Sequence, residues 1–167
     1  GASLGVGSGM HLTDFGGKCL SEDFPMLLDV LSDVLRHPTF PEEHIELVRN
    51  QKLVGIQERY QDTGRVASMG FYEQIYEDEH RYGRTVGGYM ESVSAIQQAD
   101  MIDFYQQRYT PNGAVLVVVG DIQTDAVIEQ VQQHLGDWQG AAPEQEVPDV
   151  APLDRIQTKM CPLPGKA

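Results

Sequence analysis

The chain has 167 residues, of which 41% are hydrophobic, and this is enough for one ordinary domain with a core of its own. Its 12 Lys and Arg against 25 Asp and Glu give a formal net charge of −13, without any basic cluster, which argues against a nucleic-acid-binding surface. No apolar run approaches the ~18 residues that a membrane-spanning helix needs, so we predict no membrane span. An acidic surface of this kind serves solubility or attracts basic peptides.

The two cysteines, Cys19 and Cys161, lie far apart in the sequence, and neither belongs to a C-x-x-C pair. The sequence therefore predicts no zinc ribbon and no redox motif. The two residues could pair or remain buried thiols, so the redox compartment stays open.

The segment from Gly1 to Lys18 alternates small and apolar residues, which predicts a hairpin of two strands. Its glycines at 5, 7 and 9 form G-x-G-x-G, a pattern also found in phosphate-binding loops. Because no buried strand precedes it and no helix follows directly, we interpret it as close strand packing. His11 is predicted to be an ordinary residue of this sheet.

Helices are predicted next. Ser21 is the expected N-terminal cap of the first, which ends at His37-Pro38. Its apolar stripe consists of Phe24, Leu27, Leu28, Leu31, Val34 and Leu35. The second runs from about Glu42 to Gln61, with these residues facing inward: Ile45, Val48, Leu53 and Ile56.

A third helix is expected over 65–76, and it buries Val66, Met69, Phe71 or Tyr72, and Ile75. A polar loop over 77–88 and a short helical turn over 91–96 follow.

The segment from Asp100 to Asp121 carries the clearest pattern. Helical spacing of apolar residues gives way at Pro111-Asn112-Gly113 to the valine-rich run Ala114–Val119. An unbroken run of this kind predicts a strand buried on both faces. A helix is expected over 124–135.

These elements predict three parts: a single α+β subdomain over 1–140, a proline- and acid-rich linker over 141–154, and the start of a following subdomain over 155–167. Residues 155–161 are expected to form the first strand of that last part. We therefore expect the chain to be a fragment of a longer protein.

Several phrases in this order resemble the pitrilysin, insulinase and mitochondrial processing peptidase family of zinc metallopeptidases. They are FYQQRYTPNGAVLVVVGDI, which ends at Ile122, the phrase HRYGRTVGG over 80–88, the helical pattern over 27–49, LGDW over 135–138 and PGK over 164–166. The resemblance extends over nearly all of residues 1–166.

The resemblance implies the α+β fold of the mitochondrial processing peptidase-like metallohydrolases. In that fold a mostly antiparallel sheet carries helices on one face, and here its N-terminal strands would be truncated. Members of the family have two homologous halves, each of two subdomains, which close over a peptide.

In the active half of this family, zinc is held by an inverted zincin motif, H-x-x-E-H, whose histidines share one helix face. This chain has no such motif, since no two of its histidines are four residues apart: His11, His37, His44, His80 and His134. The acidic clusters over 42–44 and 77–80 each hold one histidine, which we interpret as solvated.

The family's remaining zinc ligand is a glutamate about two turns after the arginine that matches Arg49. Here the position falls on Gly55 or Ile56, and neither residue can bind a metal. Glu58 lies one turn further along, about 5.4 Å away, which is too far for Zn–O distances of ~2 Å. We therefore predict no catalytic, cofactor-binding or metal-binding residue here, and zinc only in the family's catalytic half.

The resemblance then implies a non-catalytic half that encloses and holds an extended peptide or protein substrate. A homologous H-x-x-E-H half, in the same chain or in a partner subunit, would hydrolyse the peptide bond, and this fragment alone would be inactive. Two alternatives stay open: a catalytic-half fragment with Glu58 as an atypical ligand, and a scaffold or assembly subunit of the same fold.

Some residues of the matching phrases are expected to be structural. Tyr82, Gly83, Gly87 and Gly88 are predicted to shape a loop. Arg49 and Arg84 are predicted to form structural ion pairs.

Overall fold

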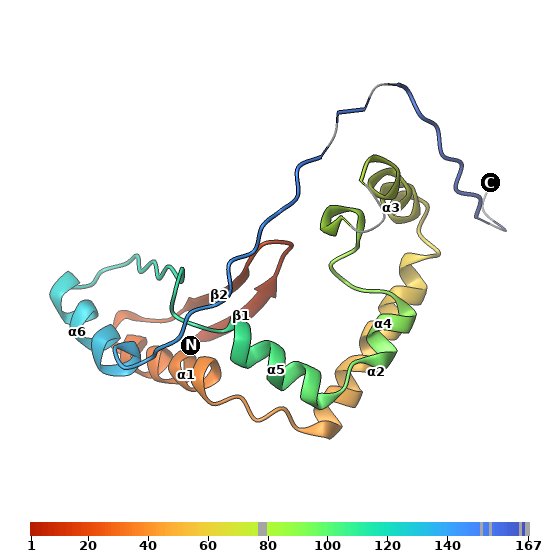
Figure 1. Cartoon of the computed structure of the whole chain (residues 1–167). Coiled ribbons are helices and arrows are strands. Elements are labelled where there is room, and N and C mark those ends of the chain that lie inside the picture. Colours follow the sequence, from red (N-terminus) through yellow and green to blue (C-terminus); the bar gives the residue numbers. More distant parts are fainter. Residues whose placement is uncertain (77–79, 151, 154, 164, 166–167) are drawn as a thin grey trace. The chain divides into compact units, whose positions relative to one another are not determined.

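The computed structural model describes residues 1–76, 80–150, 152–153, 155–163 and 165. In these residues the chain is α+β, with six α-helices and one two-stranded antiparallel sheet (Figure 1). It divides into two compact units, one made of Gly1–Phe40 with Ala99–Glu144 and the other of Pro41–Gln98 with Gln145–Ala167. The predicted fold class is confirmed, while the boundaries at 140 and 154 stay predictions.

In the first unit, strands β1 (Ser3–Ser8) and β2 (Thr13–Lys18) form the predicted hairpin. The amide of Gly9 donates to the carbonyl of Leu12 across the turn, at 2.8 Å. The glycine pattern thus lies in a strand and its turn, as the strand-packing interpretation required. His11 is not on a strand as predicted, because it falls within this turn.

Helices pack against one face of the hairpin. Phe15 and Gly17 lie on the same face because side chains alternate along a strand. Gly17 meets Leu27 of α1 (Phe24–Arg36), whose Cδ2 would lie 3.0 Å from a Cβ at that position. The Phe15 ring meets Tyr109, just after α5 (Gln98–Arg108), with ring centroids 6.4 Å apart. A larger residue at position 17 would therefore require the Leu27 side chain to shift by a few tenths of an ångström.

Helix α1 begins differently from the prediction. Ser21 is not its cap, because Ser21–Asp23 form a short 3-10 turn, η1, and Asp23 takes the N-cap position. Pro25 occupies the first turn, where its missing amide hydrogen costs nothing. Of the predicted stripe, Leu28 is fully buried but Val34 is nearly half-exposed.

Side chains of α1 complete the end of α6 (Thr124–Leu135), whose bounds agree with the prediction. Ser32 Oγ and Arg36 Nη1 both donate to the His134 carbonyl, at 2.9 and 2.8 Å. Carbonyls in the last turn of a helix have no partner within the helix, so these donors cap it. Arg36 also forms an ion pair with Asp137 at 2.9 Å, and its hydrogen bond and positive charge lower the pKa of that carboxyl.

Helix α5 is tied to α1 through Tyr105, whose hydroxyl donates to the Leu35 carbonyl at 2.9 Å. The ring also meets Phe40 edge-on, with centroids 5.7 Å apart. Burial raises the pKa of the Tyr105 hydroxyl, although the charge of Arg36 opposes the rise.

The second unit contains α2 (Glu42–Arg59), α3 (Thr63–Ile75), the 3-10 turn η2 (Arg81–Gly83) and α4 (Met90–Ala95). Helix α3 starts at Thr63 rather than Arg65, because the side chain of Asp62 caps it by accepting from the Arg65 amide at 2.9 Å. None of the helices in the described part of the chain has both the length and the apolar character that crossing a membrane requires.

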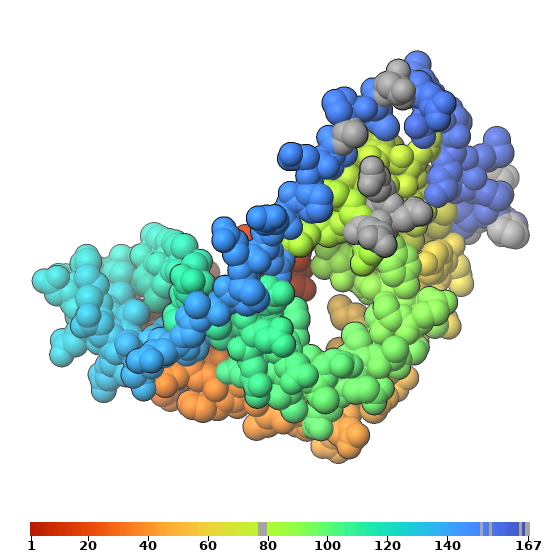
Figure 2. Space-filling view, in the orientation of Figure 1, coloured from red at the N-terminus to blue at the C-terminus, as the bar shows by residue number. Residues whose placement is uncertain are grey.

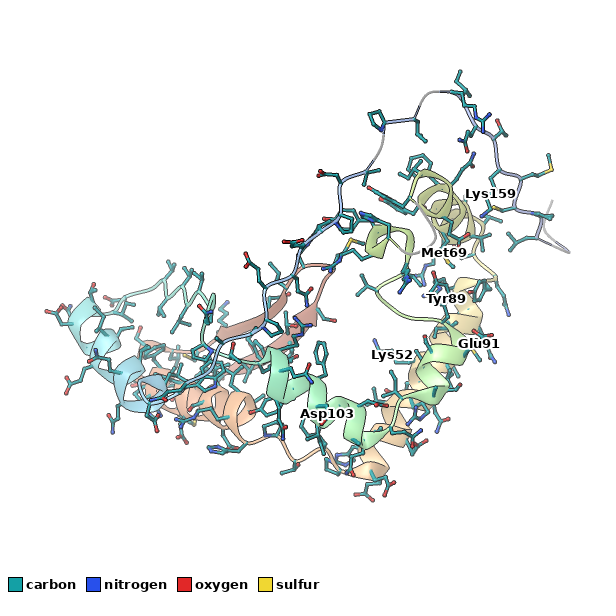
Figure 3. All side chains as sticks on the ribbon, in the orientation of Figure 1. Lys52, Met69, Tyr89, Glu91, Asp103 and Lys159 are labelled. Carbon is teal, nitrogen blue, oxygen red and sulfur yellow. The ribbon has the colours of Figure 1, made fainter. Side chains whose placement is uncertain are left out.

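Helix α2 packs against α4; Figure 3 labels Lys52 on the first and Glu91 on the second. Ile45 and Ile56 are its buried residues. Val48 was predicted to face inward, but it is half-exposed and Arg49 faces inward beside it. On α3, Phe71 and Tyr72 are both about half-exposed, and Gly70 is the buried residue there.

The run Ala114–Val119 does not form the predicted strand buried on both faces. Val115, Val117 and Val119 are 86%, 75% and 89% exposed. Leu116 and Val118 instead line an open apolar depression of about 350 Å³ together with residues of α6. Leu116 is itself 47% exposed, so neither face of the run is buried, and among the described residues no strand pairs with it. Residues 155–161, also predicted as a strand, have no regular secondary structure.

Candidate functional site

The face of α2 where the resemblance places a metal-binding glutamate carries no ligand. Gly55 is exposed, and the space that a side chain would occupy there is open. Ile56 is only 3% exposed and belongs to the core of the unit. Whichever alignment is used, the position is held by a residue that cannot coordinate zinc.

The alternative ligand Glu58 points to solvent one turn further along α2, and His44 is exposed in the first turn. Within the described ranges, no three His, Cys, Asp or Glu side chains lie together in a way that could hold a metal ion. The residues present here do not fit a zinc site. Of the acidic-histidine cluster over 77–80, residues 77–79 lie outside the described residues.

His80 is not the solvated residue that we predicted: it is 8% exposed. Its Nδ1 accepts from the Tyr82 amide at 3.1 Å, and its Nε2 lies 3.1 Å from the Pro148 carbonyl. Because the amide can only donate and the carbonyl can only accept, this pair of partners requires the tautomer with hydrogen on Nε2. Tyr76 stacks on the ring at 5.0 Å, and Tyr82 packs edge-on at 4.9 Å. The aromatic residues at positions 76 and 82 were the sequence signal that could have predicted the burial of His80.

The glycine-rich loop over 84–88 is held by Arg59, a residue that the sequence analysis missed. Its Nη2 donates to the Gly88 carbonyl at 2.7 Å and its Nη1 to Thr85 Oγ1 at 3.1 Å. Gly88 has a φ of +72°, and a Cβ there would lie 2.8 Å from a Val93 methyl group. This confirms the loop-shaping role predicted for Gly88.

Arg49 also has a structural role, as predicted. It forms an ion pair with Glu46 at 3.0 Å and donates to the Val93 carbonyl at 2.6 Å. Arg84 is exposed, and its predicted ion pair is not found among the described residues. Cys19 and Cys161 are free thiols, one in each unit.

The family model described as "Peptidase M16 inactive domain" matches residues 95–161. The chain is 29% identical over 136 residues to an uncharacterized zinc protease of Mycobacterium leprae, covering 81% of this chain and 30% of that protein. It is 26% identical over 137 residues to the human mitochondrial-processing peptidase subunit beta, covering 82% and 28%. The chain therefore spans about 30% of the length of these relatives.

Solved structures share the fold. The peptidase M16 inactive domain of Pseudomonas fluorescens superposes with a TM-score of 0.82 at 22% identity, over 90% of this chain and 37% of that one. A protease of Helicobacter pylori gives a TM-score of 0.77 at 18% identity, over 90% and 36%.

The helix-on-sheet fold and the matching phrases define a metallopeptidase-like α+β protein. The chain is similar to the pitrilysin, insulinase and mitochondrial processing peptidase family, peptidase M16, and residues 95–161 are similar to the domain that the family model describes as inactive.

Proposed function

We propose that this chain is part of a non-catalytic half of a zinc metallopeptidase. The observation that carries the proposal is the occupation of the expected ligand position on α2 by Gly55 or by the core residue Ile56. A glycine offers no donor atom, and moving Ile56 out of the core to make room for a ligand would cost packing energy. The match to the inactive-domain model supports the same conclusion.

The proposed role is to enclose an extended peptide or protein substrate while a homologous half carries out hydrolysis. That half would supply H-x-x-E-H, with its zinc, from the same chain or from a partner subunit. Support comes from the relatives: the human one is named a beta subunit, and a structure from Escherichia coli is titled the first half of a periplasmic protease. The formal charge of −13 would favour substrates with basic segments.

A comparison of the whole protein with this chain tests the proposal. We expect this chain, supplied with zinc, to leave a quenched fluorogenic peptide uncleaved, and to bind the labelled peptide in a fluorescence anisotropy titration. We expect Glu58→Gln in the whole protein to leave kcat unchanged. A loss of kcat of about 100-fold or more in that variant would instead make Glu58 a working ligand.

The same experiment distinguishes the proposed substrate-holding role from the alternative role of a scaffold or assembly subunit. A whole protein that neither cleaves nor binds peptides, with this chain folded as described, would favour a scaffold subunit over a substrate-holding half.

A further inference from the structure

The described residues after position 144 belong to the second unit. Figure 2 shows them in blue against the yellow-green atoms of α3. We refer to the described residues within 145–161 as the strap. It contacts the unit in two places, first at the loop of His80 and Arg81 and then along α3.

At the first place, the loop binds the main chain of the strap. Arg81 Nη2 donates to the Glu146 carbonyl at 3.1 Å, and His80 Nε2 lies 3.1 Å from the Pro148 carbonyl. Carbonyls two residues apart point to the same side of an extended segment, so one loop can reach both. Arg81 Nη1 adds a hydrogen bond to the Gln145 side chain at 2.8 Å.

The sequence of the strap favours this extended form. Proline disfavours the helical region for the residue before it, so Pro148 holds Val147 extended. The ordering of this segment therefore costs less conformational entropy than an ordinary sequence would.

At the second place, alternate residues face α3. Gln74 Nε2 donates to the Gln157 side chain at 3.3 Å, and Lys159 Nζ pairs with Glu73 at 2.8 Å; Figure 3 shows Lys159 beside the helix. The thiol of Cys161 lies against Gly70, 2.6 Å from where a Cβ would stand.

The residues that alternate with these contacts point away. Ile156 is 99% exposed and Met160 is 88% exposed. Contact at every second residue is the period of an extended chain, and the contacted helix residues share one face of α3 because they are three and four apart.

We propose that the His80–Arg81 loop and the Gly70 face of α3 form a docking site for an extended polypeptide, and that the chain's own strap is its occupant. The first part of the site binds main-chain carbonyls. The second part leaves a small gap over Gly70 that accommodates a side chain of the bound segment. It explains why a buried histidine with a fixed tautomer is found in this loop. The proposal is independent of whether the chain holds substrate.

Two variants of His80 test its two hydrogen bonds separately. Asn can accept from the Tyr82 amide in place of Nδ1 but has no atom at the Nε2 position, whereas Gln can supply a donor there. His80→Asn should release the strap, and His80→Gln should retain more of it. Arg81→Met removes both donors to the strap, with Arg84→Met, an exposed arginine of the same loop, as the matched control.

Gly70→Ala tests the second part separately. Alanine favours a helix over glycine, so α3 should not be weakened. Its Cβ would lie 2.6 Å from the Cys161 thiol, so that side chain must shift, and we expect the strap to loosen with it. A gain in helix stability together with a looser strap is an outcome that general unfolding would not produce.

Two measurements on the full chain report whether the strap is bound. One is cleavage by Glu-C protease after Glu146, and the other is alkylation of Cys161 by iodoacetamide; both are followed by mass spectrometry. Each reaction follows the population of the open form. We expect Arg81→Met and His80→Asn to raise Glu146 cleavage about fivefold, from the loss of one net hydrogen bond or more. Gly70→Ala should raise Cys161 alkylation by a similar factor.

Alkylation of Cys19, which lies in the other unit, is the internal control and should not change. If Glu146 and Cys161 already react in the unmodified chain as fast as in a peptide of residues 143–161, the strap is free and the proposal is wrong. The same conclusion follows if Arg81→Met and Arg84→Met behave alike while Gly70→Ala has no effect on Cys161.

Discussion

The loop over 80–88 and the run Ala114–Val119 form an instructive pair. The loop has no apolar pattern, yet side chains from α2 and from within the loop hold it at several points, among them Arg59 at Gly88 and His80 at Tyr82. The run has the strongest strand pattern in the sequence, yet it forms no strand and exposes Val115, Val117 and Val119. Strand propensity measures how well a side chain fits a sheet, so it has no effect unless a neighbouring strand is there to pair.

The largest expected effect concerns the core of the second unit. Ile56→Ala should lower the free energy of unfolding by roughly 2–4 kcal/mol, because it opens a cavity where the side chain is 3% exposed. Val54→Ala on the exposed side of the same helix should change it by less than about 0.5 kcal/mol. Urea unfolding followed by circular dichroism measures both, and equal effects would mean that α2 packs differently.

The next largest effect is expected at Arg59, which holds the loop over 84–88. Arg59→Met keeps most of the aliphatic stem but removes the donors to Gly88 and Thr85. We expect a loss of roughly 1–3 kcal/mol in the free energy of unfolding and faster amide exchange over 84–88, because a part-buried carbonyl loses its charged partner. Lys52→Met, a neutralisation elsewhere on α2, is the control. Unchanged exchange in the Arg59 variant would show that the glycines alone fix the loop.

A smaller effect concerns the first unit and depends on pH. The pKa of Asp137 is below its ordinary value of 3.8, chiefly because Arg36 donates a hydrogen bond to it. Its contribution to stability is therefore present above the unfolded pKa and is lost as the pH falls through the folded pKa. Asp137→Asn should flatten the fall in stability below about pH 4. An acid titration identical to that of the unmodified chain would contradict the ion pair.

The smallest effect is expected in the valine run. Val117→Thr should change the stability of this chain by less than about 0.5 kcal/mol, because the side chain is 75% exposed and its replacement opens no cavity. Val131→Ala in α6, which lines the depression and is less exposed than Val117, should have a larger effect. A large loss for Val117→Thr would show that the run is packed in solution.

The sequence predicted elements best where local chemistry determines them. The helix over 124–135 was predicted to the residue, and the hairpin followed from alternation and turn residues. Arg59 and the burial of His80 were missed because their partners, such as Pro148, lie far away in the sequence. Ser21 was misassigned because a 3-10 turn and a capped helix begin with similar residues.

The prediction that this chain has no zinc ligand rests on the family's ligand pattern rather than on the periodicity of the sequence. The structure adds a physical reason at Ile56, which is needed in the core, and at Gly55, which has no side chain. No composition or spacing rule alone would have singled out these two positions.

Zinc content, measured by metal analysis after dialysis and then by calorimetric titration, tests the central claim most directly. The account predicts no stoichiometric zinc in this chain and no change in that result for Glu58→Gln or His44→Ala. One tightly held zinc per chain that either substitution removes would contradict it, and would place a metal site on α2.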